Sequence, residues 1–403
     1  MTGSIPQPAG PLQGVRVLDL SRVLAGPYCA MMLGDMGAEV IKIEQPGEGD
    51  ETRAWGPPFA GGESAYYLAA NRNKRGITLN LKHPEGRQIL LDLVRRADVL
   101  IENFKLGTLE RMDLADGTFW QVNPGLIHAS ITGFGTAGPY AEYGGYDFII
   151  QAMSGIMSVT GEPAGEPMKV GIAIVDVTAG LFTLNGILAA LYARRDTGRG
   201  QRIDVSLLES ALAWLVNVGQ NYLVSGEPAR RYGNAHPNVV PYQVFYANDR
   251  PLALALANPR QFRTFCELAG RPELADDRRF RSNADRLANR AQLIPIVQSL
   301  VAQRSADEWL AILNANGVPA GPINTVAEAF ADPQVHALGA VVALPHPTAG
   351  DVRVVGSPIH MSDTPVRPRS APPLHGADTA AVLSELLHLP QERIAELRQA
   401  GAI

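Results

Sequence analysis

The sequence predicts a protein of the α/β class, with a Rossmann-like, doubly wound parallel sheet in a large domain and a smaller α+β domain. In the first half of the chain, short apolar runs typical of buried strands alternate with stretches of helical period. The length of 403 residues also exceeds the size at which a single hydrophobic core usually stops growing. We therefore expect a parallel sheet covered by helices on both faces, followed by a second domain.

The first strand, helix and strand lie close to the N-terminus. After a Pro- and Gly-rich start, GVRVLDLS predicts a buried strand over residues 14–21, and AEVIKIE predicts a second strand over 38–44. Between them, residues 27–38 predict a helix that ends near Gly37. Strand, helix and strand in this order are typical of the βαβ unit of parallel sheets.

The same alternation continues along the chain. Strands are expected at residues 76–81, 98–103, 126–134 and 201–207, and helices at 84–97, 146–159 and 177–196. Small residues recur along the last of these helices, namely Ala179, Gly180, Gly186 and Ala189. They favour close packing against another helix, although they would also admit a ligand.

The composition of the sequence changes near residue 225. A polar loop rich in Pro and Gly covers 225–241, and a pair of strands joined by a turn is expected at 242–247 and 251–257. Amphipathic helices are expected at 261–270, 289–303, 305–317 and 391–401. The expected domains are thus a large domain over 1–224, a small domain over 225–330, and a C-terminal segment over 331–403.

Composition and charge argue against several kinds of partner. The net charge of −5 and the pI near 5.9 indicate neither nucleic acid nor an anionic membrane, so an anionic ligand would need local basic residues. No uninterrupted apolar run reaches the ~18 residues of a membrane span, and the N-terminus lacks the pattern of a signal peptide. Cys29 and Cys266 lie far apart, as in a reducing compartment. We expect a soluble, cytoplasmic protein with both cysteines in its core.

A glycine-rich motif, G-x-G-x-x-G at residues 133–138, formally matches the fingerprint of nicotinamide dinucleotide sites. Its context argues against that function, because Pro139 follows the third glycine and no apolar helix opens within the motif. A glycine-rich loop at an active site is the interpretation that we favour.

Polar and basic residues gather near the ends of several expected strands. Residues 71–75 (NRNKR) lie beside the strand at 76–81, and residues 103–112 follow the strand at 98–103. A single charge run is usually a solvated surface. Two of them in an acidic protein favour an anion site, in which Phe104 would stack on a purine. Residues 22–27 follow the first strand and either offer backbone amides to a phosphate or form a plain tight connection.

Asp176 follows an apolar stretch and begins a largely apolar helix. An aspartate at such a position most often caps the helix. The amides and dipole of a helix start would also keep a carboxylate ionised, and thereby hold it ready as a nucleophile. Both interpretations stay open from the residues alone.

The histidines and cysteines show no spacing typical of a metal site, and no G-x-S-x-G indicates a serine hydrolase. The sequence therefore predicts no metal centre. His236, in the loop over 225–241, is either solvated or in contact with a substrate.

Six long stretches carry a family resemblance: RVLAGPYCAMMLGDMGAEVIKIEQPGEGDETR, NRNKRGITLNL, DVLIENF, YDFIIQAMSG, VGIAIVDVTAGLF and RRDTGRGQRIDVSL. They resemble class III CoA-transferases, the family that includes formyl-CoA transferase and carnitine CoA-transferase. Residues 53–75 and 232–245 are most similar to its succinate–hydroxymethylglutarate (glutarate) branch, whose members exchange CoA among dicarboxylic acids.

The resemblance implies that Asp176 is a covalent nucleophile. Its carboxylate would attack the donor thioester to give a mixed anhydride and CoA thiolate, which would then form an aspartyl-CoA thioester. Coenzyme A is a substrate in this scheme, no prosthetic group is expected, and water must be kept out during turnover. Formyl-CoA transferase shields its intermediate with a glycine-rich loop, where this sequence has GNAHPNV. Gln45 stands where some members have a basic residue.

The resemblance also implies which residues hold the substrates. The expected contacts to CoA are Leu24, Ala25, Lys74, Arg75, Asn103, Phe104, Arg111, Met112 and Tyr146. Of these, Lys74 and Arg75 would meet the phosphates, and Tyr146 would lie near the reacting thioester. A cation should meet the distal carboxylate of a dicarboxylic acid, and the candidates are Arg53, Arg231 and His236. The family further implies an interlocked homodimer whose C-terminal segment returns to the large domain.

Two other functions fit parts of the sequence. An α-methylacyl-CoA racemase, a relative of similar fold, uses a His–Asp pair, but Tyr146 stands at the position of that histidine. A CoA-ester binding protein without turnover is the second alternative, against which Asp176 argues. We expect succinyl-CoA as the donor and a C5 or branched dicarboxylate as the acceptor. Malate, citramalate, itaconate, mesaconate and oxalate stay open.

Overall fold

The computed structural model describes residues 10–403, which form two compact units. Unit 1 comprises the chain up to Ser154 together with Gly171–Trp214 and Pro333–Ile403, and unit 2 comprises Gly155–Val170 and Leu215–Asp332. The units therefore differ from the expected domains, because the chain enters unit 2 twice. The sequence marks the second entry, near residue 225, but not the first.

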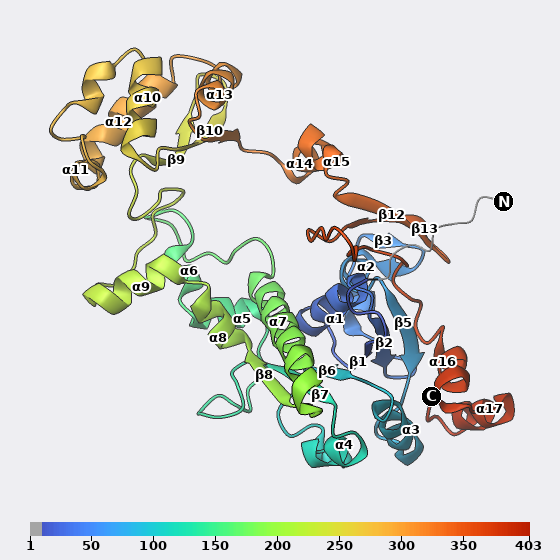
Figure 1. The fold of residues 1–403 in the computed structure, drawn as a ribbon. Helices are drawn as coiled ribbons and strands as arrows, with labels where there is room; N and C mark the ends of the chain where they lie inside the picture. The colour runs from blue at the N-terminus through green and yellow to red at the C-terminus, as the bar shows by residue number, and fades with distance from the viewer. Residues whose placement is uncertain (1–9) are drawn as a thin grey trace. The chain divides into compact units, whose positions relative to one another are not determined.

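Unit 1 contains a six-stranded sheet in the order β5-β2-β1-β6-β7-β8 (Figure 1), and every neighbouring pair is parallel. Its strands are β1 (Arg16–Asp19), β2 (Glu39–Glu44), β5 (Lys74–Thr78), β6 (Val99–Glu102), β7 (Ile127–Thr132) and β8 (Arg202–Ser206). The expected α/β fold with a parallel sheet is confirmed. The strand order reverses between β1 and β6, and ligands of open α/β sheets bind at the carboxyl ends beside such a reversal.

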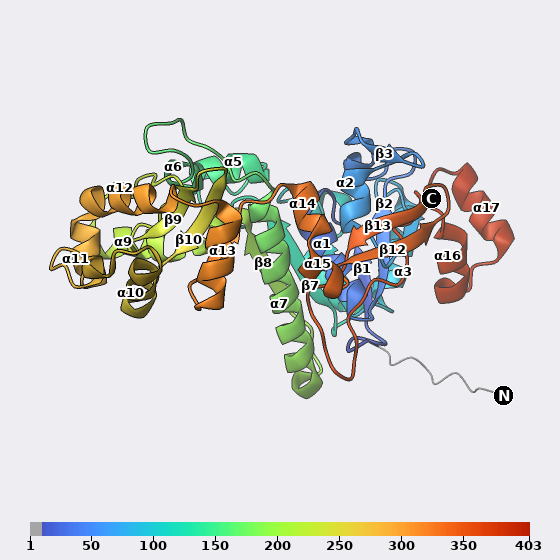
Figure 2. The same ribbon diagram turned by 90° about the horizontal axis from the view of Figure 1, so that it is seen from above.

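Helices cover both faces of this sheet. Successive residues of a strand point to opposite faces, so they belong to two different cores. Val17 belongs to the core shared with α1 (Ala25–Asp35) and α7 (Ile174–Thr197), whereas Leu18 belongs to the core on the other face. That other face is covered by α3 (Pro84–Val94), α4 (Asp116–Val122), α16 (Thr379–Leu387) and α17 (Gln391–Gln399). Figure 2 shows α16 beside α3, so the end of the chain completes the core of unit 1.

The helix α7 is long and apolar enough, by length and composition alone, to cross a membrane, with a mean hydropathy of 1.8. The sequence analysis considered uninterrupted apolar runs, and polar residues such as Asp176 and Asn185 interrupt α7. The core helix of a globular domain passes the same test, and α7 packs against α1, β7 and β8. A Cβ at Gly180 would lie 2.6 Å from the Ala25 carbonyl oxygen, so this glycine permits the close approach of α7 to α1.

The helix expected over 146–159 is broken in two. It consists of α5 (Asp147–Met153) and α6 (Ile156–Val159), separated by Gly155 with a φ of 92°. Only glycine adopts this left-handed conformation without strain. The break coincides with the passage of the chain from unit 1 to unit 2.

Unit 2 is built on a three-stranded antiparallel sheet in the order β11-β10-β9. The expected strand pair is confirmed as β9 (Tyr242–Tyr246) and β10 (Pro251–Ala255), whereas β11 (Ala320–Pro322) was not expected. The helices are α9 (Val216–Ser225), α10 (Pro259–Leu268), α11 (Asn283–Ala288), α12 (Arg290–Val301), α13 (Ala306–Ala315) and α14 (Val326–Ala331), with the short helix η3 (Pro272–Ala275). Trp309 stacks on Phe265 in their common core.

Several short elements complete unit 1. They are η1 (Glu51–Ala54), β3 (Phe59–Ala60), β4 (Glu63–Ser64), α2 (Ala65–Ala70), η2 (Glu110–Met112), α8 (Leu207–Ala213), α15 (Pro333–Ala337), β12 (Val341–His346) and β13 (Gly350–Val355). The hairpin of β12 and β13 was not expected from the Pro-rich sequence around it. Cys29 and Cys266 are both free and buried, as expected.

Candidate active site

A cavity of unit 1 opens at the carboxyl ends of β1, β6 and β7. Three loops line it: Arg22–Ala25 after β1, Asn103–Leu106 after β6, and Gly133 after β7. The lining is completed by Glu51, Ile131, Thr132, Ala141, residues 143–146, Asp176 and Leu207. The sheet thus places its ligand-facing edge around one carboxylate on the first turn of α7.

Asp176 is nearly buried, with 8 % of its surface exposed. Burial and the negative charge of Asp147 raise its pKa from 3.8 to about 7. The cap of α7 is Ala173, which has no side-chain cap, so Asp176 is the third residue of the helix and does not cap it. Both expectations from the sequence are therefore corrected: Asp176 is not a cap, and the helix start does not keep its pKa low.

After burial, the second cause of the raised pKa of Asp176 lies on another helix. Asp147, the first residue of α5, accepts hydrogen bonds at Oδ2 from the backbone N–H groups of Val175, at 2.8 Å, and Asp176, at 3.4 Å. These are the groups that a capping side chain normally satisfies. Because Asp147 accepts from them, they do not stabilise the Asp176 carboxylate. The sequence analysis missed Asp147, since 29 residues separate it from Asp176.

Tyr66, on α2, is a second residue that the sequence analysis missed. Burial and the charges of Asp176, Asp147 and Asp50 raise its pKa to about 12. Its hydroxyl therefore keeps its proton at neutral pH and is able to donate a hydrogen bond. The ring meets Trp55 edge to face, at 5.2 Å between centroids.

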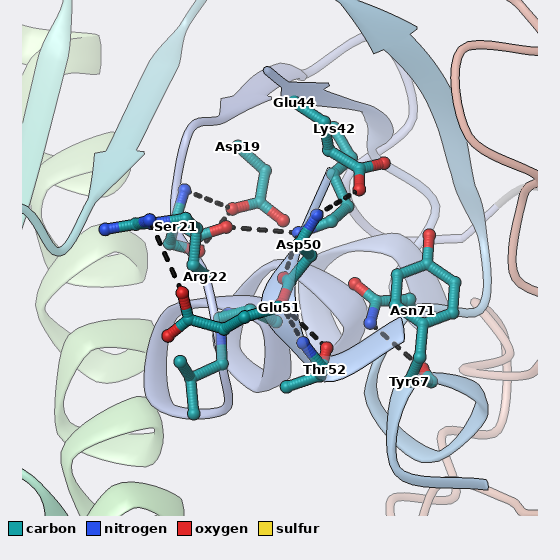
Figure 3. A network of polar contacts seen from close by, with 12 residues as sticks. Asp19, Ser21, Arg22, Lys42, Glu44, Asp50, Glu51, Thr52, Tyr67 and Asn71 are labelled. Atoms are coloured by element: carbon teal, nitrogen blue, oxygen red, sulfur yellow. Dashed lines mark hydrogen bonds and ion pairs between the residues drawn. The ribbon is translucent and has the colours of Figure 1, made fainter. Parts of the chain in front are cut away.

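A network of buried charges holds the loop after β1. The Lys42 ammonium, which is completely buried, donates to Asp50 Oδ2 at 2.8 Å and to the Ser21 carbonyl at 3.1 Å (Figure 3). Burial opposes the charge of Lys42, but the carboxylates of Asp50, Asp19 and Glu44 raise its pKa above the usual value. The ammonium therefore ties the loop to β2.

The other end of the network is Asp19, the last residue of β1. It accepts from the Ser21 N–H at 3.0 Å and from Lys74 Nζ at 2.9 Å. Burial would raise its pKa, but the charges of Lys74 and Lys42 lower it. Val23, in this loop, has a φ of 68°, a strained conformation for a β-branched residue. The network supports that strain beside the cavity.

A comparison with known families decides what this architecture belongs to. The family model described as CoA-transferase family III matches residues 12–379. The chain belongs to this family. It is a CoA-transferase, and the thioesters of coenzyme A are the substrates of its family.

Relatives of this CoA-transferase match over nearly its whole length. Succinate–glutarate CoA-transferase of Agrobacterium fabrum is 47% identical over 388 residues, which cover 95% of this chain and 97% of that protein. Human succinyl-CoA:glutarate CoA-transferase is 42% identical and covers 98% and 90%. A solved CAIB/BAIF family protein from Brucella suis is 46% identical, with a TM-score of 0.83 and coverage of 94% and 100%.

Five of the residues expected to contact CoA line the cavity of this CoA-transferase: Leu24, Ala25, Asn103, Phe104 and Tyr146. Asn103 holds the loop after β1 through both ends of its amide. The Arg22 N–H donates to its Oδ1 at 2.8 Å, and its Nδ2 donates to the Arg22 carbonyl at 2.7 Å. Arg111 and Met112 lie on η2 and do not line the cavity. Arg111 donates to Thr108, and Met112 packs against the core.

Lys74 and Arg75 are not presented to the cavity. Lys74 is completely buried, with its ammonium bound to Asp19 and to the Pro27 carbonyl, while Arg75 pairs with Glu39 at 3.2 Å and Glu385 at 2.8 Å. Their expected role at the phosphates is corrected. The strand β5 begins at Lys74 rather than at residue 76, so these cations belong to the sheet and not to a loop.

Arg53 is also corrected as a substrate cation. Its guanidinium donates to Glu44, Glu63 and the Tyr67 hydroxyl, and its side chain is only 12% exposed. These acceptors neutralise it within the protein. Arg22 and Lys105, which belong to the segments expected to bind an anion but not to the expected CoA contacts, both line the cavity.

The two remaining candidates, Arg231 and His236, belong to unit 2. Arg231 donates to the carbonyls of Glu162 and Gly165. His236 Nδ1 accepts from the N–H groups of Asn238 and Val239, and burial with the charge of Arg290 lowers the pKa of this histidine. His236 is therefore neutral at pH 7, with its proton on Nε2.

Proposed function

We propose that this CoA-transferase carries CoA from succinyl-CoA to glutarate, with Asp176 as the covalent nucleophile. The observation that carries the proposal is the state of Asp176: a basic, nearly buried carboxylate in a cavity at the carboxyl edge of the sheet. Glu51, the other acidic residue of the lining, faces Arg22 at 3.5 Å and is more exposed. An unpaired carboxylate is the better nucleophile.

The names of the relatives support the choice of acids. The relatives from Agrobacterium and human, at 47% and 42% identity, are both named for succinate or succinyl-CoA and glutarate. Relatives at 42%, 35% and 39% identity are named for oxalate, D-citramalate and mesaconate. All of these acids are dicarboxylic, so glutarate is the first acceptor to test and the others form the panel.

The proposed reaction proceeds by four exchanges at carbonyl carbon. The Asp176 carboxylate attacks the thioester of succinyl-CoA, the C–S bond breaks, and a mixed anhydride and CoA thiolate result. The thiolate attacks the Asp176 carbonyl, which releases succinate and leaves an aspartyl-CoA thioester. Glutarate attacks this thioester and expels the thiolate, which then attacks the glutaryl carbonyl of the new anhydride. Glutaryl-CoA and free Asp176 are the products. The protonated hydroxyl of Tyr66 is the proposed donor to the oxyanions.

The cavity lining supports a position for the nucleotide of CoA. We place its purine against Phe104 and its phosphates near Arg22 and Lys105, because these side chains line the cavity together. The guanidinium of Arg22 already lies over the Phe104 ring, at 5.9 Å. Arg111 and Met112 stay proposed contacts beyond the lining, since Arg111 is exposed and bonds a neutral hydroxyl.

For the distal carboxylate of the acid, Arg231 is the remaining proposed cation. Its backbone contacts leave part of the guanidinium for a carboxylate, whereas Arg53 is neutralised and His236 is uncharged. Arg231→Gln should raise the KM for glutarate at least tenfold and leave the KM for succinyl-CoA within about twofold. Equal effects on both substrates would contradict this assignment.

The experiment that tests the function is incubation of the pure protein with succinyl-CoA and a panel of dicarboxylic acids, followed by mass analysis of the CoA esters. We expect glutaryl-CoA from the wild type and none from Asp176→Asn. Hydroxylamine added during turnover should convert the aspartyl thioester into a hydroxamate at Asp176, located by peptide mass analysis. Transfer by Asp176→Asn at the wild-type rate would exclude this nucleophile. Preferential use of oxalate or mesaconate would exclude glutarate.

We also propose that the enzyme acts as a homodimer, interlocked as in its family. The helix α9 supports a second copy: it has no buried residue, and Val216, Leu223 and Val224 are each more than 70% exposed. An isolated helix of ten residues is barely stable in water, so this apolar surface needs a cover. Sedimentation should give twice the chain mass of 43.2 kDa. A monomer that keeps full activity would contradict the proposal.

A further inference from the structure

The first turn of α7 is capped by a different helix. A helix normally presents its first free N–H groups to the side chain of its own cap, but here the cap residue is Ala173, whose side chain cannot accept. Asp147 of α5 accepts from the second and third residues of α7 instead, at 2.8 Å and 3.4 Å. Its other oxygen, Oδ1, accepts from Gln151 at 2.5 Å. Asp147 is itself buried, with 8% of its surface exposed.

The same carboxylate is the second negative charge beside Asp176. The amides of α7 and the Gln151 amide of α5 bond to Asp147, and the charges of both aspartates raise the pKa of Tyr66 on α2. Among the described residues no cation pairs with Asp176, and Asp147 is the charged residue that acts on its pKa. The amides of the first turn of α7 thus donate to Asp147, so they do not stabilise the carboxylate of Asp176.

We propose that Asp147 is a positioning residue that fixes the first turn of α7 and keeps the Asp176 carboxylate strongly basic. This inference rests on the proposed role of Asp176 as the nucleophile. It assigns to Asp147 no contact with substrate. Its action is exerted through the backbone of Val175 and Asp176 and through its charge.

The basicity has a chemical consequence for the mixed anhydride. The thiolate can attack either carbonyl, and the carboxylate on the other side leaves. Attack at the Asp176 carbonyl forms the C–S bond of aspartyl-CoA and breaks the C–O bond to the succinyl group. The less basic carboxylate is the better leaving group, and a free carboxylic acid has a pKa of about 4. A more basic Asp176 therefore favours release of succinate over return to succinyl-CoA.

Two variants that remove the charge test the proposal: Asp147→Asn keeps the shape, and Asp147→Ser keeps a good capping group. The control is Asp98→Asn. Asp98 also accepts a backbone N–H, from Arg16 at 2.8 Å, but it precedes β6, at the opposite edge of the sheet from the cavity. Each protein is mixed with succinyl-CoA in a single turnover between pH 5 and 9, and the Asp176 hydroxamate is quantified with time.

In the wild type and in Asp98→Asn, we expect the rate of labelling to rise with a midpoint near pH 7, since the attacking group is the ionised Asp176. In both Asp147 variants the midpoint should move down by at least one pH unit. The plateau rate should fall about two- to threefold for each pH unit of that shift, because a less basic carboxylate attacks more slowly, with a nucleophilicity coefficient of about 0.4–0.5.

The outcomes separate this inference from the proposed function. If no hydroxamate forms at Asp176 in the wild type, the nucleophile itself is wrong. If Asp176 is labelled in all four proteins and the midpoint stays at the wild-type pH in the Asp147 variants, the positioning role is overturned. Unfolding of both Asp147 variants, with Asp98→Asn folded, would reduce Asp147 to a structural cap and also overturn it.

Discussion

Asp176 illustrates at the residue scale how a reactive group costs stability. Its pKa is about 7 in the folded protein and 3.8 in the unfolded chain. Between these values the folded state holds a proton that the unfolded state has lost, so folding stability falls as the pH rises through this window. Above pH 7 the full cost is present, and a change from 3.8 to about 7 corresponds to about 4 kcal/mol.

We therefore expect Asp176→Asn to be inactive but more stable than the wild type at pH 8. The gain should be a few kcal/mol, seen as a higher Tm, and it should shrink as the pH falls towards 3.8, below which the unfolded chain also protonates Asp176. Thermal unfolding of the two proteins across pH 4–8 measures the difference. A gain that is the same at every pH would show that the charge of Asp176 is not its cause.

Lys42 is a residue whose charge supports the site from inside the protein. Lys42→Met would leave Asp50 and Asp19 buried beside one cation fewer, and removal of one partner of a buried pair costs about 3–5 kcal/mol. Arg95→Met, which breaks a half-exposed pair with Asp92, should cost less than about 1 kcal/mol. Denaturant unfolding of both variants checks the contrast. Equal losses would contradict it.

Sequence reasoning singled out Asp176, the proposed nucleophile, and missed the charged and polar residues around it. Asp176 stands out because a carboxylate interrupts an apolar stretch. Asp147 and Tyr66 do not, because their relation to Asp176 arises only when α5 and α2 fold beside α7. Lys74 was expected at a phosphate because of the family resemblance and because it lies in a run of cations. A run of cations looks like a loop, and the sequence does not tell that its ammonium turns inward to Asp19.

At the scale of elements, the contact of α7 with α1 brings Asp176 to the loop after β1. Gly180→Ala would place a Cβ 2.6 Å from the Ala25 carbonyl oxygen. Because this oxygen belongs to the backbone, it could move away only if the loop after β1 moved with it. We expect a loss of about 1–3 kcal/mol in stability and a fall in kcat/KM, because Ala25 lines the cavity.

The matched control for this variant is Gly117→Ala in α4, where a Cβ meets nothing within 4 Å. That change should be neutral or stabilise the protein by up to about 1 kcal/mol, with unchanged activity. Tm and steady-state kinetics of both variants decide the matter. A Gly180→Ala protein as stable and active as the wild type would show that the helix contact is not tight.

Whether the sequence predicted an element depended on how long the element is and how deeply it is buried. Strands buried in the parallel sheet are apolar runs between turn residues, and all six were expected close to their observed bounds. The short antiparallel strands β11 to β13 were missed, because they contain prolines and glycines and one face is exposed. The break between α5 and α6 depends on Gly155, whose conformation the sequence does not determine.

At the scale of the whole molecule, unit 1 depends on its C-terminal segment. Ile394 of α17 is completely buried in the core on one face of the sheet. Ile394→Ala should cost about 2–5 kcal/mol, whereas Glu396→Ala, an exposed change on the same helix, should stay within about 0.5 kcal/mol. Denaturant midpoints compare the two. Similar midpoints would mean that α17 is only loosely attached to the sheet.

The order of the segments along the chain has a consequence for synthesis. The six strands of the sheet are complete once Ser206 has been made, but α16 and α17, which cover one face, come last. Ribosomes add roughly 5–20 residues per second, so α16 and α17 follow about ten to forty seconds later, after Leu215–Asp332 of unit 2 has been produced. During this interval α3 and α4 cover only part of that face, and the nascent chain displays the rest as an apolar surface that chaperones recognise.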